Sequence, residues 1–385
     1  MKIAFAQNSL YNMKAGILGG GQLGRMLLQA AANYTVETYV LENDENCPAA
    51  HLCHHFTKGD IKDFETVYQF GKNLDVLTIE IEAVNIEALE KLEQEGKKVF
   101  PKPSAIRIFR NKILQKEFYV NNEIPTSAFL ITKNTDELKA NISFLPAVHK
   151  IAEGGYDGRG VQVLEDEKDL DKAFELPSIL EKKVAIKKEI ALIIATNASG
   201  EFTIFPPAEM IFDPRLNLLD YQLSPAIISK NILWKAEAIV QKLVKALNSP
   251  GLFAVELFID INDQVLVNET APRVHNSGHH TIEANYCSQF DMLWRIMLDY
   301  PLGNPAAILP SAIVNIIGAQ GYTGEAQYEG LNEVLKMEHV FVHLYGKKDT
   351  KPGRKMGHAT IIGNDYSDLA HMANKIKDTI IVKSI

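Results

Sequence analysis

The chain is poor in cysteine and has no long apolar run. Its three cysteines, Cys47, Cys53 and Cys287, are too few for a disulfide framework among 385 residues, so we expect a reducing cytoplasmic location. No stretch of 18 apolar residues occurs, so we expect no transmembrane helix and no membrane as a partner. The first residues, MKIAFAQNSLYNMK, lack the long apolar core of a secretory signal peptide.

Positive charge is also in deficit. The 40 lysines and arginines are outnumbered by 48 aspartates and glutamates, which gives a net charge of −8. Proteins that bind nucleic acid need a basic surface, so nucleic acid is not an expected partner. Apolar residues make up 46% of the chain and charged residues 23%, a composition that excludes disordered, collagen-like and coiled-coil proteins. The length predicts two or three domains.

The first hundred residues alternate between strand-like and helix-like segments. Residues 15–34 have the pattern of a short apolar strand, a glycine turn and an Ala/Leu-rich helix. Further strands are predicted at 37–43 and 75–82, with a helix over 64–71 between them. Strands that alternate with helices indicate a parallel sheet covered by helices, so the predicted fold class is α/β.

Proline-rich segments divide the rest of the chain. PKP at 101–103 precedes a helix predicted over 104–121, and PLGNPAAILP at 301–310 has the composition of a second linker. Between them we expect β-rich stretches, a helix over 230–248 and a hairpin over 252–270. Strand-like segments and a last helix follow the second linker. The expected domains are 13–110, 111–305 and 306–385.

The glycine turn near the N-terminus has the spacing G-x-G-x-x-G from Gly19 to Gly24. Glycines let a phosphate approach the backbone, and the start of the following helix attracts negative charge, so Gly21 and Gln22 are candidate phosphate contacts. Glu42 ends the next strand, as in a ribose-binding unit. The pattern does not choose between a dinucleotide and a sugar phosphate, and a tight turn needed only for packing is the alternative.

Two acidic residues, Glu80 and Glu82, end the predicted strand over 75–82. Strand alternation places both on one face, at the edge where ligands gather in sheets of this class. We therefore expect them to contact substrate. A solvated edge strand is the alternative.

The hairpin over 252–270 carries a pair of facing carboxylates. A two-residue turn at Asn262–Asp263 would pair Glu256 with Glu269 on one face, with Cβ atoms about 4.5–5.5 Å apart. Like charges so placed destabilise the sheet unless a cation lies between them. Mg²⁺ takes one or two carboxylates together with substrate phosphates, so the pair predicts a metal–nucleotide site. Asn268 could add an oxygen ligand.

Polar residues crowd the loop that follows this hairpin. Arg273 could bind a phosphate or an anionic transition state through its planar donors. His275, His279 and His280 suggest zinc, as do Cys53, His54 and His55 near Cys47, but neither group has the ligand spacing of a zinc site. Packed or surface histidines are the expected alternative.

Two further segments could bind anions. Gly154–Gly160, GGYDGRG, has four glycines in seven residues, as expected of a loop that closes over a nucleotide, although a simple glycine hairpin would have the same composition. Lys150 lies just before it, where a strand would aim it at phosphates. Near the C-terminus, Lys347 and residues 351–358 concentrate positive charge, and Arg354 is the strongest candidate for a phosphate contact.

Together these segments resemble the ATP-grasp superfamily, and within it the N5-carboxyaminoimidazole ribonucleotide synthetases (PurK type). The resemblance is carried by GILGGGQLGRML, LTIEIE, GGYDGRG, FAVELF, LVNETAPRVHNSGHHT and KPGRKMGH, in the family's order, from residue 16 to 358. It implies a Rossmann-like N-terminal domain, an ATP-grasp domain and a small C-terminal domain. It also implies a homodimer.

The resemblance implies a specific reaction. ATP phosphorylates bicarbonate to carboxyphosphate, whose carboxyl group passes to the amine of aminoimidazole ribonucleotide, with ADP and phosphate as the other products. Bicarbonate is a poor electrophile, and phosphorylation supplies a leaving group; positioning and charge stabilisation do most of the catalysis. The implied cofactors are ATP and Mg²⁺, as one ion or two, with Mn²⁺ as a substitute.

The resemblance also assigns residues. Glu256 and Glu269 match the Mg²⁺ ligands. Asp157, Arg159 and Arg295 match catalytic groups. The residues expected to bind ATP are Lys112, Lys150, Gly155, Tyr156, Asp157, Gly158, Arg159, Gly160, Glu181, Lys182, Lys183, Val184, Glu189, Asn268 and Glu269. Those expected to bind the ribonucleotide or bicarbonate are Gly21, Gln22, Glu80, Glu82, Tyr156, Arg273, His275, Asn276, Ser277, Lys347 and Arg354.

The sequence departs from the family at two places, and other functions remain open. The adenine segment EKKVAIKKEIAL is more basic than usual, and Lys112 stands where arginine is frequent. A formate-dependent glycinamide ribonucleotide transformylase or a biotin carboxylase is a related alternative, although NSGH and KPGRKMGH favour the aminoimidazole enzyme. An NAD-linked oxidoreductase would leave the paired glutamates and GGYDGRG unexplained. Glu256 and Glu269 also argue against a non-catalytic nucleotide-binding regulator.

Overall fold

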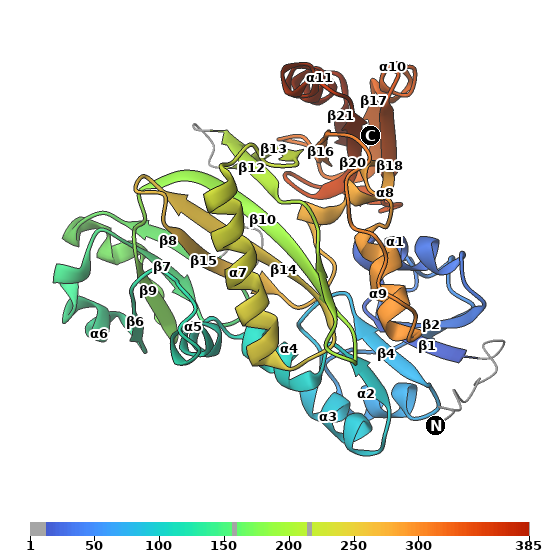
Figure 1. Ribbon diagram of the computed structural model, residues 1–385, viewed down its shortest axis with the longest axis horizontal. Coiled ribbons are helices and arrows are strands. Elements are labelled where there is room, and N and C mark those ends of the chain that lie inside the picture. The colour runs from blue at the N-terminus through green and yellow to red at the C-terminus, as the bar shows by residue number, and fades with distance from the viewer. Residues whose placement is uncertain (1–12, 156–159, 214–217, 385) are drawn as a thin grey trace.

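The computed structural model describes residues 13–155, 160–213 and 218–384 (Figure 1). The N-terminal unit is the expected α/β layer, a five-stranded parallel sheet in the order β3-β2-β1-β4-β5. All four residues of its β4 strand are buried, as a sheet covered on both faces requires. The elements are β1 (Met13–Leu18), α1 (Gln22–Ala31), β2 (Val36–Glu42), β3 (His55–Lys58), α2 (Phe64–Gly71), β4 (Val76–Ile79), α3 (Ile86–Gln94) and β5 (Lys98–Phe100).

The helix expected over 104–121 is two helices, α4 (Pro103–Arg110) and α5 (Lys112–Asn121). Asn111 separates them in an extended conformation, with φ −116° and ψ 120°. Its side-chain oxygen accepts hydrogen bonds from the N–H groups of Ile113 and Leu114, which satisfies two donors at the start of α5. The prediction of one continuous helix is therefore wrong, because an N-cap asparagine interrupts it.

A nine-stranded sheet forms the middle of the molecule, in the order β15-β14-β10-β12-β13-β16-β20-β18, with β11 paired to β10. Helix α7 (Lys230–Leu247) packs its apolar stripe on β10, β14 and β15, and lies across the face of the sheet in Figure 1. The strands are β10 (Ile186–Thr196), β11 (Phe202–Ile204), β12 (Ala208–Asp213), β13 (Leu218–Ser224), β14 (Gly251–Asp260), β15 (Val265–Ala271), β16 (Ser311–Ile317), β18 (Val340–Leu344) and β20 (Lys355–Ile362).

This sheet continues past the second predicted linker. Gln222 of β13 pairs with Ile313 of β16, so strands from either side of residues 301–310 belong to one sheet. Helix α11 (Tyr366–Thr379) packs on the C-terminal strands, and a three-stranded sheet flanks them. The flanking elements are β17 (Gly324–Glu329), α10 (Leu331–Val334), β19 (Asp349–Thr350) and β21 (Ile381–Ser384).

A separate four-stranded antiparallel sheet, β6-β9-β7-β8, extends from one end of the large sheet (Figure 1, left). It carries the segment that leads into the glycine-rich loop. Its elements are β6 (Phe129–Thr132), α6 (Thr135–Lys139), β7 (Ala147–Ile151), β8 (Val161–Leu164) and β9 (Ser178–Lys182). Within the described parts of the chain, no helix has the length and apolar character needed to cross a membrane.

Helix α9 (Gln289–Met297) joins the N-terminal unit to the rest of the molecule. It packs against α1, and Trp294 on it is fully buried and donates its indole N–H to the carbonyl of Leu27 at 2.7 Å. Helix α8 (Thr281–Ala284) precedes it. The apolar area of Trp294 and this hydrogen bond therefore hold two units of the chain together.

We expect Trp294→Ala to lower the free energy of unfolding by about 3–5 kcal/mol, because it removes a buried indole and leaves a cavity. The chain's other tryptophan, Trp234 on α7, is 68% exposed and supplies a matched control. Trp234→Ala should change stability by about 0.5 kcal/mol or less. Urea denaturation measures both, and equal losses would contradict this assignment.

Candidate active site

Strands β14 and β15 pair Glu256 with Glu269, as the sequence predicts, but by a different route. The turn spans three residues, 261–263, and is closed by a hydrogen bond from the Asp260 N–H to the Gln264 carbonyl, so the two-residue turn is wrong. A bulge at Asn268 then shifts the register back by one residue. The pairs between turn and bulge are Ile259 with Val265, Phe258 with Leu266 and Leu257 with Val267.

The two facing carboxylates have opposite electrostatic surroundings. The Lys112 ammonium lies 2.9 Å from Glu269 Oε2 and holds the pKa of that carboxyl well below its usual range. Desolvation and the nearby Glu269 charge raise the pKa of Glu256. Lys112, at the start of α5, therefore compensates the negative charge of this pair from within the chain, and the charge of Lys150 adds to it.

The donors around this pair fit a hard divalent cation. Glu256, Glu269 and the Asn268 side-chain oxygen offer oxygen ligands only, the set that Mg²⁺ prefers. In the described ranges, no group of three or more His, Cys, Asp or Glu side chains is arranged to hold a metal. Two carboxylates match an ion that takes its other ligands from phosphates and water, as in nucleotide-dependent enzymes.

Lys150 lies beside the carboxylate pair, as expected from its place before the glycine-rich loop. It projects from β7, with its Nζ 2.9 Å from Glu181 Oε2 and 3.0 Å from Asn268 Oδ1. Burial alone would raise the pKa of Glu181, but Lys150 and Lys116 together hold it below its ordinary value. The structure thus brings together three of the predicted ATP-binding residues.

The neighbouring strand contributes Glu189. It lies on β10, where desolvation raises its pKa to about 7. Between β9 and β10 run Lys183 and Val184, while Lys182 ends β9. The Lys182 ammonium donates to the carbonyl of Phe144 and the Lys183 ammonium pairs with Glu165, so both side chains are engaged by other parts of the small sheet.

The described ends of the glycine-rich loop adjoin β7 and β8, whose pairing sets Lys150 opposite Val161. Gly154 and Gly160 have positive φ angles of 83° and 77°, which favour glycine, and the Gly160 carbonyl accepts the Ile151 N–H. Gly155 is described. The predicted contacts Tyr156, Asp157, Gly158 and Arg159 lie outside the described residues.

The N-terminal glycine turn is already occupied by a carboxylate of the chain. Glu80 accepts hydrogen bonds from the N–H groups of Gly21 at 2.5 Å and Gly24 at 2.6 Å. A Cβ at Gly21 would lie 2.5 Å from Glu80 Oε1, which explains the glycine. Glu42 likewise accepts the Gly20 N–H. Glu80 therefore engages the N–H groups of Gly21 and Gly24, where the glycine spacing predicts a phosphate.

Glu80 and Glu82 do not share a face by strand alternation, because β4 ends at Ile79. Glu80 turns to the start of α1, whereas Glu82 pairs with Arg273, with the two side chains 2.9 Å apart. Arg273 follows β15, so this ion pair ties the N-terminal sheet to the end of the carboxylate hairpin. The prediction of a common face is wrong for this reason.

The C-terminal cations meet the N-terminal unit. Lys347 Nζ donates to Gln22 Oε1 at 2.9 Å, and Arg354 donates to the Asp349 carbonyl. Lys347 and Arg354 line a cavity of about 340 Å³. Lys347 therefore links this cavity to Gln22, and the resemblance implies substrate contacts for Gln22, Lys347 and Arg354. The remaining lining residues are Asp44, Asn46, Pro48, Lys348 and Asp349.

The other predicted site residues are more scattered. Arg295 Nε lies 2.8 Å from Asp291 Oδ2, one turn earlier on α9, and Asp291 also accepts the hydroxyl of Tyr34, which follows α1. His275 contacts Ser277 at 2.9 Å in the loop after Arg273.

Neighbouring residues of this loop are buried. Asn276, His279 and His280 are all enclosed, and burial lowers the pKa of His280 to about 4. A neutral, packed His280 agrees with the alternative to a zinc site, in which these histidines are packed or surface residues.

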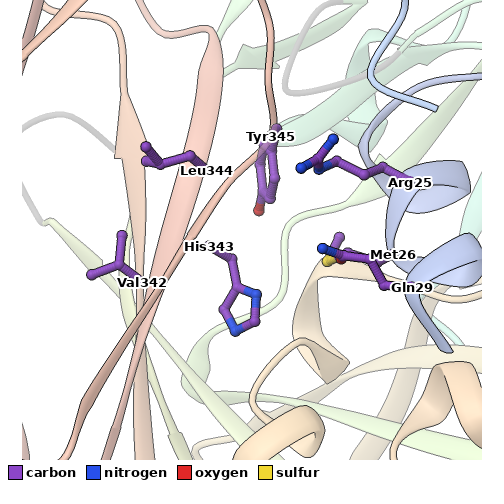
Figure 2. Close-up of a pocket in the computed structure, with 7 residues that line it drawn as sticks. All are labelled: Arg25, Met26, Gln29, Val342, His343, Leu344 and Tyr345. Atoms are coloured by element: carbon purple, nitrogen blue, oxygen red, sulfur yellow. The ribbon is translucent and has the colours of Figure 1, made fainter. Parts of the chain in front are cut away.

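Two features have no counterpart in the sequence reasoning. Lys116, four residues after Lys112 on α5, is buried against Glu181; a same-face spacing was the available signal. A second cavity, of about 310 Å³, separates α1 from β18 (Figure 2). There, side chains of α1 face those of the strand; the lining residues are Arg25, Met26, Gln29, Val342, His343, Leu344 and Tyr345.

Comparison with known proteins agrees with this arrangement. Residues 12–110 match the ribonucleotide synthetase preATP-grasp domain, 117–290 the ATP-grasp domain, and 311–372 the phosphoribosylaminoimidazole carboxylase C-terminal domain. The N5-carboxyaminoimidazole ribonucleotide synthase of Staphylococcus aureus (strain COL) is 34% identical over 91% of this chain and 93% of its own length. The chain belongs to the N5-carboxyaminoimidazole ribonucleotide synthase family. Its members are ATP-grasp ligases of purine biosynthesis, and this chain is such a ligase.

Solved structures of the family share the whole fold. The N5-carboxyaminoimidazole ribonucleotide synthetase of Thermotoga maritima has a TM-score of 0.90 and 35% identity, and the match covers 97% of this chain and 100% of that one.

A longer relative matches in sequence. The phosphoribosylaminoimidazole carboxylase of Vigna aconitifolia is 36% identical over 94% of this chain, which spans 66% of that relative. The expected fold and enzyme class, which the sequence resemblance implied, are confirmed.

Proposed function

We propose that the chain carboxylates aminoimidazole ribonucleotide at the expense of ATP, with bicarbonate as the carboxyl source. The observation that carries this proposal is the facing pair Glu256 and Glu269, with Lys112 paired to Glu269 and Lys150 hydrogen-bonded to Asn268 beside it. A structure from Aspergillus clavatus, with a TM-score of 0.86 and 31% identity over 96% of this chain and 99% of that one, is described in complex with ADP and 5-aminoimidazole ribonucleotide. Stimulation of ATP hydrolysis by the ribonucleotide tests the proposal.

Mg²⁺ would be held by Glu256, Glu269 and the Asn268 side-chain oxygen. When bound, it neutralises phosphate charge and orients the terminal phosphoryl group for transfer. Lys150 is placed to hold phosphate oxygens, since its strand directs the ammonium to Asn268. Lys112 would then exchange part of its pairing with Glu269 for a phosphate contact.

The rest of the nucleotide lies between the two antiparallel sheets in this proposal. The Glu189 carboxylate on β10 would accept hydrogen bonds from ribose hydroxyls, and the backbone from Glu181 to Val184 would face adenine. Transfer of the terminal phosphoryl group to bicarbonate creates a phosphate leaving group, so the amine of the ribonucleotide can attack the carboxyl carbon. The chain's work is to hold three reactants in line and exclude water.

The ribonucleotide would lie where the three units meet. Gln22, Lys347 and Arg354 would receive its phosphate, and Glu80, Glu82, Arg273, His275, Asn276 and Ser277 would surround its remainder. Asp157 and Arg159 are proposed as catalytic groups on the resemblance alone. Arg295, which pairs with Asp291 on α9, is proposed as a catalytic group on the resemblance as well. A homodimer and a cytoplasmic location are proposed on the resemblance as well.

We expect Arg354→Ala to raise the KM for the ribonucleotide by about tenfold or more, because it removes one charge-assisted contact to phosphate. The KM for ATP should stay within twofold of the wild-type value. Lys351→Ala, an exposed neighbour in the same turn, supplies the matched control and should leave both constants unchanged. Equal effects of Arg354→Ala on the two KM values would reject a substrate-phosphate role.

A further inference from the structure

Helix α5 buries an unusual face. A helix packed in a protein normally turns apolar side chains inward, but the three buried side chains of α5 are Gln115, Lys116 and Tyr119. Gln115 accepts the Thr270 N–H, and Tyr119 shares a hydrogen bond with the Thr270 hydroxyl. These contacts hold the residue next to Glu269. The inner face of α5 is therefore built for polar contacts with the proposed ATP site.

Lys116 is the charged residue of this buried face, and it pairs with a buried carboxylate. Only 2% of its side chain is exposed, and its ammonium lies 2.8 Å from Glu181 Oε1. It also contacts the hydroxyls of Thr126 at 2.5 Å and Ser127 at 3.1 Å. The two hydroxyls accept hydrogen bonds from the ammonium and Glu181 pairs with its charge, so groups of the chain itself enclose Lys116.

Glu181 contacts both Lys116 and Lys150 through its two carboxylate oxygens. Its Oε1 faces Lys116, and its Oε2 lies 2.9 Å from Lys150 Nζ. Lys150 in turn reaches Asn268 Oδ1 at 3.0 Å, in the bulge beside Glu269. One buried carboxylate is thus shared between two ammonium groups, and only one of the two can meet a phosphate.

We propose that Lys116 is a positioning residue for ATP binding: by holding Oε1 of Glu181, it fixes the direction in which Oε2 presents the Lys150 ammonium. This inference rests on the proposed role of Lys150 as a phosphate ligand. Lys116 itself touches no substrate.

The charge balance explains why a second cation is needed. With Lys116 removed, Glu181 would direct its whole negative charge to Lys150 and would be free to rotate about its terminal torsion. Lys150 would then be drawn toward the carboxylate and would offer less positive charge to a phosphate. A purely structural contact would be served as well by apolar side chains, because buried ion pairs gain little stability over them.

The protonation of Lys116 gives the inference a second readout. The groups that face its ammonium are Glu181 on β9, Lys150 on β7 and Lys112 on α5, with the neutral hydroxyls of Thr126 and Ser127. Burial and the two lysines lower its pKa to about 8, against the attraction of Glu181. Lys116 is charged below that pH and loses its proton above it, so the KM for ATP should rise between pH 8 and 9.

The test compares Lys116→Met, Lys116→Arg and Lys150→Met in steady-state kinetics with ATP varied. We expect Lys116→Met to raise the KM for ATP by about tenfold at pH 7.5, the worth of one charge-assisted hydrogen bond, with kcat within threefold. Lys116→Arg, whose charge does not titrate, should keep a KM near the wild-type value and remove the rise above pH 8.

A destabilised fold would behave differently. Leu243→Ala, which empties a buried position on α7, should lower Tm and the active fraction while leaving the KM for ATP unchanged. An unchanged KM in Lys116→Met, alongside a raised KM in Lys150→Met, would overturn the inference and leave the proposed function intact. An unchanged KM in Lys150→Met would reject the phosphate role of Lys150 itself. If Lys116→Arg does not fold, the Lys116→Met result decides.

Discussion

Glu269→Gln is expected to abolish turnover, with kcat reduced by about a thousandfold or more. The substitution keeps the size of the side chain but removes one of the two charges that face each other across β14 and β15. It also takes away the ion-pair partner of Lys112. Steady-state ADP release with saturating ATP, bicarbonate and ribonucleotide measures the effect.

A matched control separates chemistry from folding. Glu325→Gln changes an exposed glutamate on β17, which belongs to the three-stranded sheet and not to the sheet of the hairpin, and should leave kcat unchanged. Circular dichroism should show the same secondary structure for both variants, because Glu269 is 42% exposed and its loss opens no core cavity. Activity retained by Glu269→Gln would contradict a metal role for the facing carboxylates.

Lys150→Met is expected to lower kcat/KM for ATP by about a hundredfold. Its ammonium lies between Glu181 and Asn268, at the edge of the carboxylate pair, so its loss removes a cation from the proposed phosphate site. A charge-assisted contact to phosphate contributes about 1.5–3 kcal/mol, which is 10- to 100-fold in binding. The loss should therefore fall largely on the KM for ATP.

The control for Lys150→Met lies in the same small sheet region. Lys139→Met, on α6, removes an exposed lysine. In the described part of the chain its ion-pair partner is Asp136, one turn earlier on the same helix. It should leave both KM values within twofold of wild type. A KM for ATP that stays near the wild-type value in Lys150→Met would show that another group holds the phosphates.

The hairpin shows how a sequence pattern can predict a site while missing its geometry. Alternation of apolar and acidic residues indicates the facing pair, because period two is a property of any strand. The turn has three residues rather than two, with Asp263 at φ 57°, and the bulge at Asn268 compensates for the difference. The bulge also turns Asn268 toward Lys150, a consequence that no local pattern contains.

The N-terminal unit shows the same limit. Its strands and helices follow from alternation and apolar periodicity, and α2 covers the predicted residues 64–71. The group that accepts the N–H groups of the glycine turn cannot be predicted in this way, because Glu80 lies 59 positions away from Gly21 in the sequence. A glycine fingerprint predicts an anion at the helix start, and the chain supplies its own.

Long-range pairing accounts for the remaining differences. The pairing of β13 with β16 makes one sheet of segments on either side of a proline-rich linker, although the linker's composition indicates a boundary. The four-residue spacing places Lys116 on the same helix face as Lys112, but it does not indicate the partner Glu181, which lies 65 positions later. Such contacts depend on tertiary packing, which single-sequence patterns do not encode.

The central claim is that ATP cleavage in this chain serves the carboxylation of a ribonucleotide. Phosphate release should be measured with ATP, Mg²⁺ and bicarbonate, with and without aminoimidazole ribonucleotide, over a range of pH. The account predicts that release is slow without the ribonucleotide and rises severalfold or more when it is added, with one phosphate formed for each ribonucleotide consumed. Phosphate release that does not respond to the ribonucleotide at any pH would contradict it.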